Sequence, residues 1–281
     1  MILGRAAPFT PLLIVTLRTI AIVALAMVAL FPLYWMLVIA LTPTGLGRQV
    51  MTFFPTTPTL ENFVTLFADR PMARWIWNSI LVATLASAIS LAFGTTCGYA
   101  LSRLRFRGAN LLLIAVLTTQ MMPATSIIVP LYMLFRAWGL LDTMQGMVVG
   151  HISLVVPLAI WMSKGFFDSI PTDLESAARI DGCTHAGAFF HVALPLAVPG
   201  LAAIFIYGFV TSWHDFLFSR TLVTSQELWT AANGIASFRG EYFTLQELQM
   251  AASLVFAIPV VVVFFVMQRW IVSGALSGSI R

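Results

Sequence analysis

Long apolar runs dominate the chain, and polar or charged residues are confined mainly to the segments between them. A helix that crosses a bilayer needs about 20 mostly apolar residues, because lipid offers no partners to its backbone polar groups. Six runs meet this requirement, at residues 20–41, 79–101, 110–132, 144–166, 199–218 and 250–267. The pattern therefore predicts an all-α membrane protein with six transmembrane helices.

Composition supports this class and excludes others. Hydrophobic residues make up 59% of the 281 positions and charged residues 9%, with a mean hydropathy of +0.93. Soluble domains average about 25% charged residues. The basic residues are scattered over short loops and form no patch, so we expect no nucleic-acid partner. Cys97 and Cys183 fall in a predicted span and a predicted loop, so we expect no disulfide between them.

The basic residues indicate an orientation. Three arginines, Arg103, Arg105 and Arg107, follow the second run, and cytoplasmic loops are enriched in such residues. This places both termini in the cytoplasm, with nine of the 15 basic residues inside and six outside. We expect residues 1–19 to form a cytoplasmic segment, residues 20–270 a six-span domain, and residues 271–281 a cytoplasmic, glycine-rich tail without regular structure.

One predicted inner loop, residues 168–198, carries a helix signal of its own. Thr172 followed by Glu175 is typical of a capping box, and Gly182 is a typical helix stop. The spacing predicts a helix of two to three turns outside the membrane. Alternatively, Glu175 has only a local role, in which it caps this helix and pairs with Arg179 one turn later.

The same helix has a face that suits a partner protein. Leu174, Ala177, Ala178 and Asp181 recur at the spacing of one helical face. Small side chains in the middle of that face allow another surface to approach closely. We therefore expect this helix to enter a groove on a partner.

A longer string identifies a family. Glu175-x-Ala177-Ala178-x-x-Asp181-Gly182, followed by Phe189, Leu194-Pro195-Leu196 and Pro199-Gly200, resembles the EAA loop, the conserved cytoplasmic loop of ABC importer permeases. The resemblance implies that this loop docks into a cleft of an ATP-hydrolysing subunit, whose closure moves the membrane helices. By position, the docking residues are Glu175, Ala177, Ala178, Asp181 and Gly182.

Further strings resemble the carbohydrate group of these permeases, which includes the maltose and glycerol-phosphate types. They are Phe31-Pro32-Leu33-Tyr34-Trp35, Asn78-Ser79, Met122-Pro123, Pro130-Leu131-Tyr132, Gly139-Leu140-Leu141-Asp142-Thr143 and Trp213-His214-Asp215-Phe216. In the last string His214 replaces the usual Asn.

The resemblance implies a type I importer fold in the bacterial inner membrane, a sugar-like cargo and transport by alternating access. The implied partners are a second permease subunit, two ABC ATPase subunits and an extracytoplasmic solute-binding protein. The chain lacks a P-loop pattern. We therefore expect it to be a non-catalytic subunit that binds no cofactor, with ATP and Mg on the partner ATPases.

Several polar residues within or near the spans are candidates for the cargo path. Pro123 and Pro130 are expected to kink the third run, close to Thr119, Gln120 and Ser126. These polar residues either line a path or contribute to helix packing. The other candidates are His151, Trp213, His214 and Asp215. His151 is alternatively a neutral group bonded to a neighbouring helix, and His214 and Asp215 are alternatively anchors at the membrane interface.

Two further groups of residues have open roles. Trp229, Asn233 and Gly234 lie in the outer segment between the last two runs, which either contacts the binding protein or is a passive cover. Cys183, His185 and His191 have too loose a spacing to predict a metal site.

Other transporter and enzyme classes fit less well. A transporter driven by an ion gradient is expected to hold carboxylates near the membrane midplane, and the assigned runs have none there. An intramembrane enzyme needs a convergent constellation of groups, which His151 alone does not supply. A non-carbohydrate cargo remains an alternative.

Overall fold

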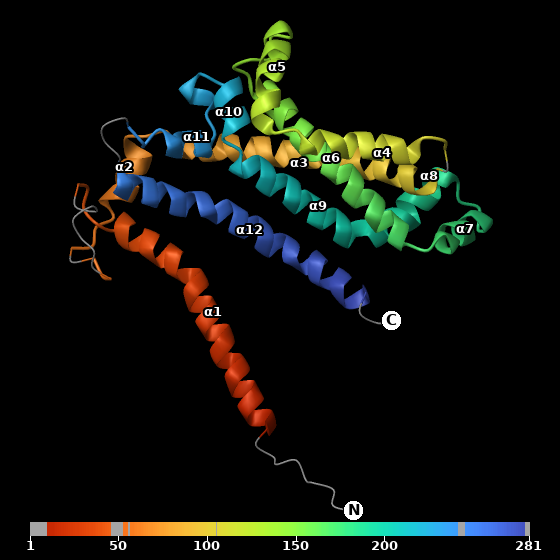
Figure 1. Ribbon diagram of the computed structural model, residues 1–281, viewed down its shortest axis with the longest axis horizontal. Coiled ribbons are helices and arrows are strands. Elements are labelled where there is room, and N and C mark those ends of the chain that lie inside the picture. The colour runs from red at the N-terminus through yellow and green to blue at the C-terminus, as the bar shows by residue number, and fades with distance from the viewer. Residues whose placement is uncertain (1–9, 46–52, 56, 105, 241–244, 279–281) are drawn as a thin grey trace, which may run out of the picture. The chain divides into compact units, whose positions relative to one another are not determined.

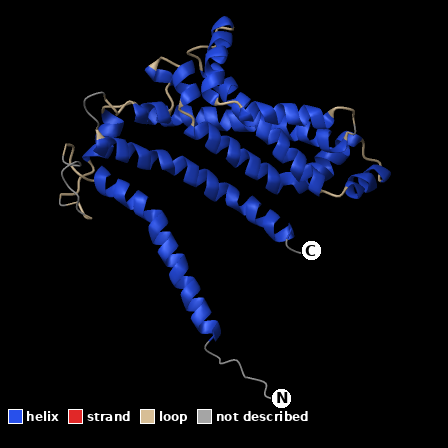
Figure 2. Cartoon of the chain, in the orientation of Figure 1, coloured by secondary structure: helices blue, strands red, loops and turns tan. Residues whose placement is uncertain are grey.

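The computed structural model describes residues 10–45, 53–55, 57–104, 106–240 and 245–278. Regular structure in these residues is helical (Figure 2). The chain divides into two compact units, with boundaries after Arg70, Ser237 and Val255. One unit holds α1, α2 and the start of α12, and the other holds α3 to α11 and the remainder of α12.

Five helices are long and apolar enough to cross a membrane. They are α1 (Thr10–Ala40), α3 (Met72–Arg103), α6 (Met144–Ser169), α9 (Leu194–His214) and α12 (Gln246–Gly278). They confirm five of the six predicted runs and begin at or before the first residue of each. The 32 residues of α3 span about 48 Å at about 1.5 Å per residue, more than a hydrocarbon core of about 30 Å.

The third predicted span is not one straight helix. It consists of α4 (Ala109–Thr118), the 3₁₀ turn η1 (Thr119–Met121) and α5 (Ala124–Ala137), with a bend of 100° between its two halves. Met122 is extended, as expected for a residue before proline, and Pro123 is the N-cap residue of α5. Pro130 lies inside α5 without ending it.

Other boundaries also differ from expectation. The fifth span ends at His214, not at residue 218, because Asp215 is extended and α10 (Leu217–Leu222) is a separate helix. The inner loop is mostly helical, with α7 (Thr172–Ile180), α8 (His185–Ala188) and a π-helical turn, η2 (Phe189–Ala193), that leads into α9. Helix α12 continues to Gly278, so most of the expected irregular tail is helical. The remaining elements are α2 (Glu61–Ala68), η3 (Gln226–Leu228) and α11 (Ala231–Ala236).

In the first unit, Asn62 of α2 closes the end of α1. Its amide nitrogen donates to the carbonyl oxygens of Ala40 and Thr42, at 2.8 and 2.7 Å, and its amide oxygen accepts from the Thr44 hydroxyl. The last carbonyls of a helix have no partner within the helix. A single buried side chain therefore satisfies two backbone acceptors where α1 ends.

In the second unit, α3, α6 and α9 run side by side (Figure 1). Glycines let α3 and α6 approach closely. A Cβ added at Gly94 would lie 2.7 Å from the Ala159 Cβ, and one added at Gly98 would lie 2.5 Å from the Ser163 Cβ. In lipid such small residues hold helices together, because close backbone contact replaces the hydrophobic driving force.

Apolar side chains close both ends of this three-helix layer. One cluster consists of Val82, Phe135, Met147, Val148, Phe218, Leu222 and Val223, and joins α5 and α10 to α3 and α6. Another consists of Phe167, Phe189, Ala193 and Ala197, and joins η2 to α6 and α9. Helix α1 in the other unit is exposed along most of its apolar length, as expected for a lipid-facing helix.

We expect Gly98→Ala to destabilise the protein by about 1–3 kcal/mol, because the new methyl group overpacks the contact with Ser163. This loss should exceed the gain of about 1 kcal/mol in helix propensity. The matched control is Gly165→Ala in α6, where an added Cβ meets nothing within 4 Å. Thermal unfolding in detergent measures both variants, and equal midpoints would contradict the close packing.

Candidate functional site

The α7 helix has no side-chain cap at its start and a glycine stop at its end. Pro171 precedes its first turn, and Thr172 makes no side-chain cap, so the predicted capping box is wrong. At the other end Gly182 has a φ of +97°. The Cys183 amide donates to the Ala178 carbonyl and the Gly182 amide to that of Arg179. This is a Schellman motif, and it confirms Gly182 as the helix stop.

Glu175 faces the body of its own chain. Its side chain is 10% exposed, and the Nε of Arg103 in α3 lies 2.6 Å from its Oε1. The Tyr99 hydroxyl, one turn earlier in α3, donates to its Oε2 at 2.6 Å. The local alternative, in which Glu175 caps α7 and pairs with Arg179, is therefore wrong: the ion-pair partner is Arg103.

The other predicted docking residues lie toward the outside. Ala177, Asp181 and Gly182 are exposed, and Ala178 is half-buried. Ile180 is 86% exposed although it is a large apolar residue. Since residues are 100° apart around a helix, Ala177 and Ile180 lie on the side opposite Glu175. The structure thus separates an inward carboxylate from an outward face of small and apolar residues.

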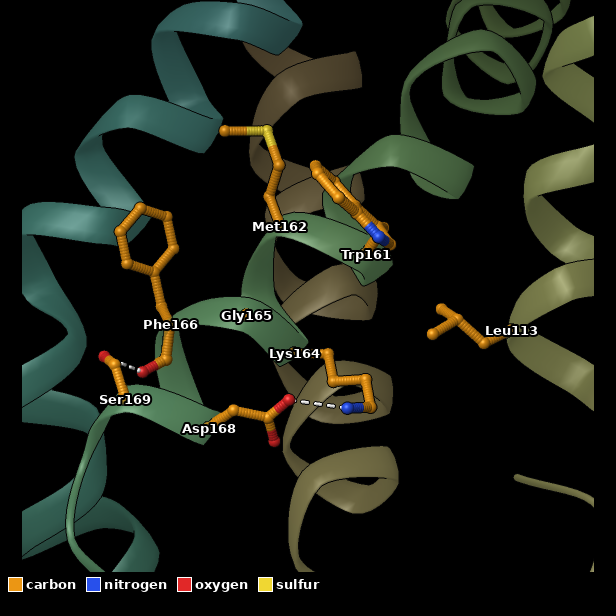
Figure 3. A pocket seen from close by; sticks show the side chains of 8 residues that line it. All are labelled: Leu113, Trp161, Met162, Lys164, Gly165, Phe166, Asp168 and Ser169. Carbon is orange, nitrogen blue, oxygen red and sulfur yellow. Dashed lines mark hydrogen bonds and ion pairs between the residues drawn. The ribbon is translucent and has the colours of Figure 1, made fainter. Parts of the chain in front are cut away.

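A second polar link joins α3 to α6 beside α7. The Ser102 hydroxyl donates to Asp168 Oδ1 at 2.6 Å, and the Lys164 Nζ lies 2.5 Å from Asp168 Oδ2. Figure 3 shows this ion pair at one side of a cavity of about 500 Å³, toward which Trp161 of α6 and Leu113 of α4 also project. The cavity is mostly apolar and adjoins the lysine's charged end, so it offers no convergent set of polar groups.

The structure brings two cargo-path candidates together. His151 Nε2 lies 3.2 Å from Asp215 Oδ2, an ion-pair distance without hydrogen-bond alignment, and the His151 Nδ1 lies 2.7 Å from the Met147 carbonyl oxygen. The Asp215 carboxylate also accepts from the Ser219 amide at 3.0 Å, which caps α10. His151 is fully buried. These two residues join α6 to the α9–α10 corner.

Their neighbours in the sequence have different surroundings. Trp213 is buried, with its ring stacked between Phe209 and Phe256. His214 is exposed and its ring meets the edge of Phe256. Trp213 is therefore part of an aromatic stack, whereas His214 and Phe216 of this string are exposed.

The break in the third span exposes polar groups. Thr119, Gln120 and Ser126 are all exposed around the 100° bend. The Gln120 amide nitrogen donates to the Leu154 carbonyl at 3.0 Å, near Pro157 in α6. Polar side chains at membrane depth are tolerated where they face a protein or a water-filled path. This is the arrangement expected at one wall of a transport path.

The candidate contacts with a binding protein are largely enclosed. Asn233 and Gly234 of α11 are buried, and a Cβ at Gly234 would lie 2.0 Å from the Trp75 ring. Trp229 packs on Trp75 with ring centroids 5.8 Å apart. Asn78 donates to the Glu227 and Trp229 carbonyls. This segment is therefore fixed to the start of α3.

A second connecting segment is also held by one side chain that bonds to its backbone, and this contact was not predicted. Asp142, between α5 and α6, has a φ of +56° and accepts from the backbone amides of Thr224 and Ser225 and from the Ser225 hydroxyl. These hydrogen bonds, with the Ser225 hydroxyl foremost, lower the pKa of the Asp142 carboxyl below its ordinary value. The carboxylate thereby ties the segment after α10 to the start of α6.

Sequence reasoning missed the roles of Tyr99 and Arg103. Arg103 stood out only as one of three arginines that indicate topology, and Arg105 lies outside the described residues. The sequence feature that could have indicated the role of Arg103 is its position at the predicted end of a span, in the last turn of α3. From there it can reach the loop that carries Glu175. The cysteines are free, as expected. Within the described ranges no group of three or more metal-binding side chains occurs.

Together, the long apolar helices and the projecting α7 define a multi-pass α-helical membrane protein with a polar element at one end. Residues 90–276 match the model of a family described as binding-protein-dependent transport system inner membrane component. The chain belongs to this family.

Relatives cover nearly the whole chain. It is 35% identical to the sulfoquinovosyl glycerol transport system permease protein of Agrobacterium fabrum, over 94% of this chain and 93% of that protein. It is 36% identical to the trehalose transport system permease protein of Mycobacterium tuberculosis, over 90% and 93% respectively. A solved bacterial ABC transporter involved in alginate import matches 95% of this chain and 99% of its own, with a TM-score of 0.77 and 22% identity, which supports the fold.

The His151–Asp215 pair leads to a stability prediction. We expect Asp215→Ala to destabilise the protein by about 1–3 kcal/mol, since it leaves the buried Nε2 of His151 without its polar neighbour and removes the α10 cap. Asp215→Asn keeps an oxygen for the cap and should cost less. His214→Ala, at the exposed neighbour, is the control. Thermal unfolding in detergent measures these losses, and lost transport by Asp215→Ala at unchanged stability would instead support a role in the cargo path.

Proposed function

We propose that this chain is the non-catalytic permease subunit of an ATP-driven, binding-protein-dependent importer for sugars or sugar-like solutes. The family and the sugar-related names of the similar permeases support this cargo class. In the proposed complex a second permease subunit completes the cargo path. Two ABC ATPase subunits hold ATP and Mg, and an extracytoplasmic binding protein delivers the cargo.

The observation that carries the proposal is the projection of α7 beyond the ends of α3 and α6 (Figure 1). Its nine residues bury only Glu175 within the chain, and Ala177 and Ile180 are exposed on the opposite side. A small, partly apolar helical face fits a groove on another protein. We assign this groove to the ATPase, so that α7 is the coupling helix of an EAA-type loop.

Charge supports the corresponding orientation. Arg103 ends α3, Arg107 lies in the turn between α3 and α4, Lys164 lies near the end of α6, and Arg179 lies in α7. An excess of basic residues marks the cytoplasmic side. We therefore place α7 and the ATPases in the cytoplasm. With six spans, both termini then lie on the cytoplasmic side, and we assign the protein to a bacterial inner membrane.

Alternating access would then follow from movement of α7. In this scheme the ATPases close on binding ATP, α7 is displaced, and the helices that carry it reorient around the cargo path. The exposed polar residues at the break in the third span form this chain's part of the path. The broken segment offers backbone and amide groups that can replace water around a hydroxylated cargo.

Proteoliposomes that contain the two permeases and two ATPases test the proposed function. With the binding protein outside, sugar uptake should require ATP inside. Ala177→Arg should lower both ATPase co-purification and uptake by at least about tenfold, equivalent to about 1.4 kcal/mol of interface energy. Ser176→Arg, exposed but turned 100° around α7, should have a smaller effect. Uptake driven by an ion gradient without ATP would overturn the proposal.

The cargo path has its own test. Gln120→Leu should lower uptake efficiency by up to about tenfold, because a lost hydrogen bond to a neutral group costs about 0.5–1.5 kcal/mol. ATPase activity without the binding protein should stay unchanged. The control is Thr118→Val, since the Thr118 hydroxyl bonds to Ile114 of its own helix. Equal uptake by the wild type and Gln120→Leu would remove Gln120 from the path.

A further inference from the structure

We propose that Glu175 is a positioning residue, which fixes α7 to the end of α3 through Arg103 and Tyr99. A displacement of α7 would then pass to α3 and α6 together. This inference rests on the proposed role of α7 as the coupling helix, and it assigns contact with the ATPase to the opposite side of α7. The resemblance to the EAA loop had placed Glu175 among the docking residues themselves.

The burial of Glu175 is the first argument. It is the one residue of α7 that is buried, and both of its carboxylate oxygens have partners within the chain. A buried carboxylate is stable only when it is paired and hydrogen-bonded. A partner protein could take up this group only if these contacts broke, so the carboxylate serves the chain's own structure.

The guanidinium of Arg103 links three elements. Its Nε donates to Glu175 of α7, its Nη2 donates at 2.9 Å to the carbonyl of Ile170, which follows α6, and the side chain itself belongs to α3. A planar fork of donors holds several acceptors in fixed directions, which a lysine cannot do. Arg103 therefore couples the position of α7 to both helices.

Tyr99 adds an apolar support to the same junction. Its ring lies 5.2 Å from the Phe167 ring of α6 and 4.6 Å from the Phe189 ring of η2, centroid to centroid. Its hydroxyl meanwhile donates to Glu175. The tyrosine thus places one hydrogen-bond donor at a fixed point among α3, α6 and η2.

The length of α7 explains why such a junction matters. A helix of nine residues is far shorter than the roughly 12–15 residues at which isolated helices become even marginally stable in water. Its orientation must therefore come from tertiary contacts. Without the Glu175 junction, a push on the outer face would be expected to rotate or unwind α7, and would not move α3.

Charge exchange tests the proposal in the complete complex. Arg103→Glu and Glu175→Arg should each lower ATP-driven uptake and binding-protein-stimulated ATPase activity by about tenfold or more, because each leaves like charges together at a largely enclosed site. The double variant should recover at least several-fold over either single variant. If Glu175 instead contacts the ATPase, the double variant stays as impaired as Glu175→Arg, and the proposal is wrong.

Matched variants separate positioning from folding and topology. Arg107→Glu makes the same charge change at an exposed position in the turn that follows α3, and should keep most of the uptake. Arg103→Lys and Tyr99→Phe leave the net charge unchanged. They should lower uptake several-fold while the amount of co-purified ATPase stays near that of the wild type. Full uptake by both would overturn the proposal even if the charge-exchange variants fail to assemble.

The same experiment distinguishes this inference from the proposed function. If the wild-type complex shows no ATP-dependent uptake, the function itself is wrong. If the wild type transports and Arg103→Glu transports equally well, the importer function stands and only the positioning role of Glu175 fails.

Discussion

The close contact between α3 and α6 determines most of what is built on it. Gly94 and Gly98 bring the two backbones together at Ala159 and Ser163, and this register places the ends of the helices level with each other. Within a bilayer, an apolar side chain gains little free energy by moving from lipid into a helix–helix contact, because lipid tails are equally apolar. The association of the helices therefore depends on such close packing and on polar contacts. A register shift of one turn, about 5.4 Å, would separate Arg103 from the carbonyl of Ile170. The junction at α7 thus depends on the packing of the preceding turns of α3 against α6.

Polar contacts then close the two ends of the layer in different ways. At the α7 end, charged groups with several hydrogen bonds each join α3, α6 and α7. At the other end, His151 and Asp215 join α6 to α10, and Asp142 holds the segment that follows α10. A broken pair at either place would leave a group with a high desolvation cost. These polar contacts specify which connecting segments are held together, and the apolar clusters at the two ends of the layer pack the same elements.

The sequence predicted the spans well because their cause is local. Length and apolar content decide whether a segment can cross a bilayer, and the stop at Gly182 depends on one backbone angle. The partner of Glu175 was not predictable in this way, since Arg103 is 72 residues away. Arg179, one helical turn after Glu175, was the nearer candidate for its ion-pair partner. The break at Pro123 was expected only as a kink, because proline specifies that a helix is interrupted and neighbouring helices decide the angle.

The two features that depend on distant contacts have opposite mechanical properties. Around Arg103, several hydrogen bonds and two aromatic contacts fix α7 to two long helices, so this junction should move as one body. Around Pro123, a 100° bend leaves α5 with one buried residue, Phe135, beside the half-buried Ile128 and Leu131. The polar residues Thr119 and Ser126 stay exposed. Bistable interfaces convert small displacements into larger ones. If α7 is the coupling helix, as proposed, a displacement of α7 would pass along α6 to the bend, where the Gln120 amide bonds to the Leu154 carbonyl. A rigid input next to a less enclosed segment is what a gate requires.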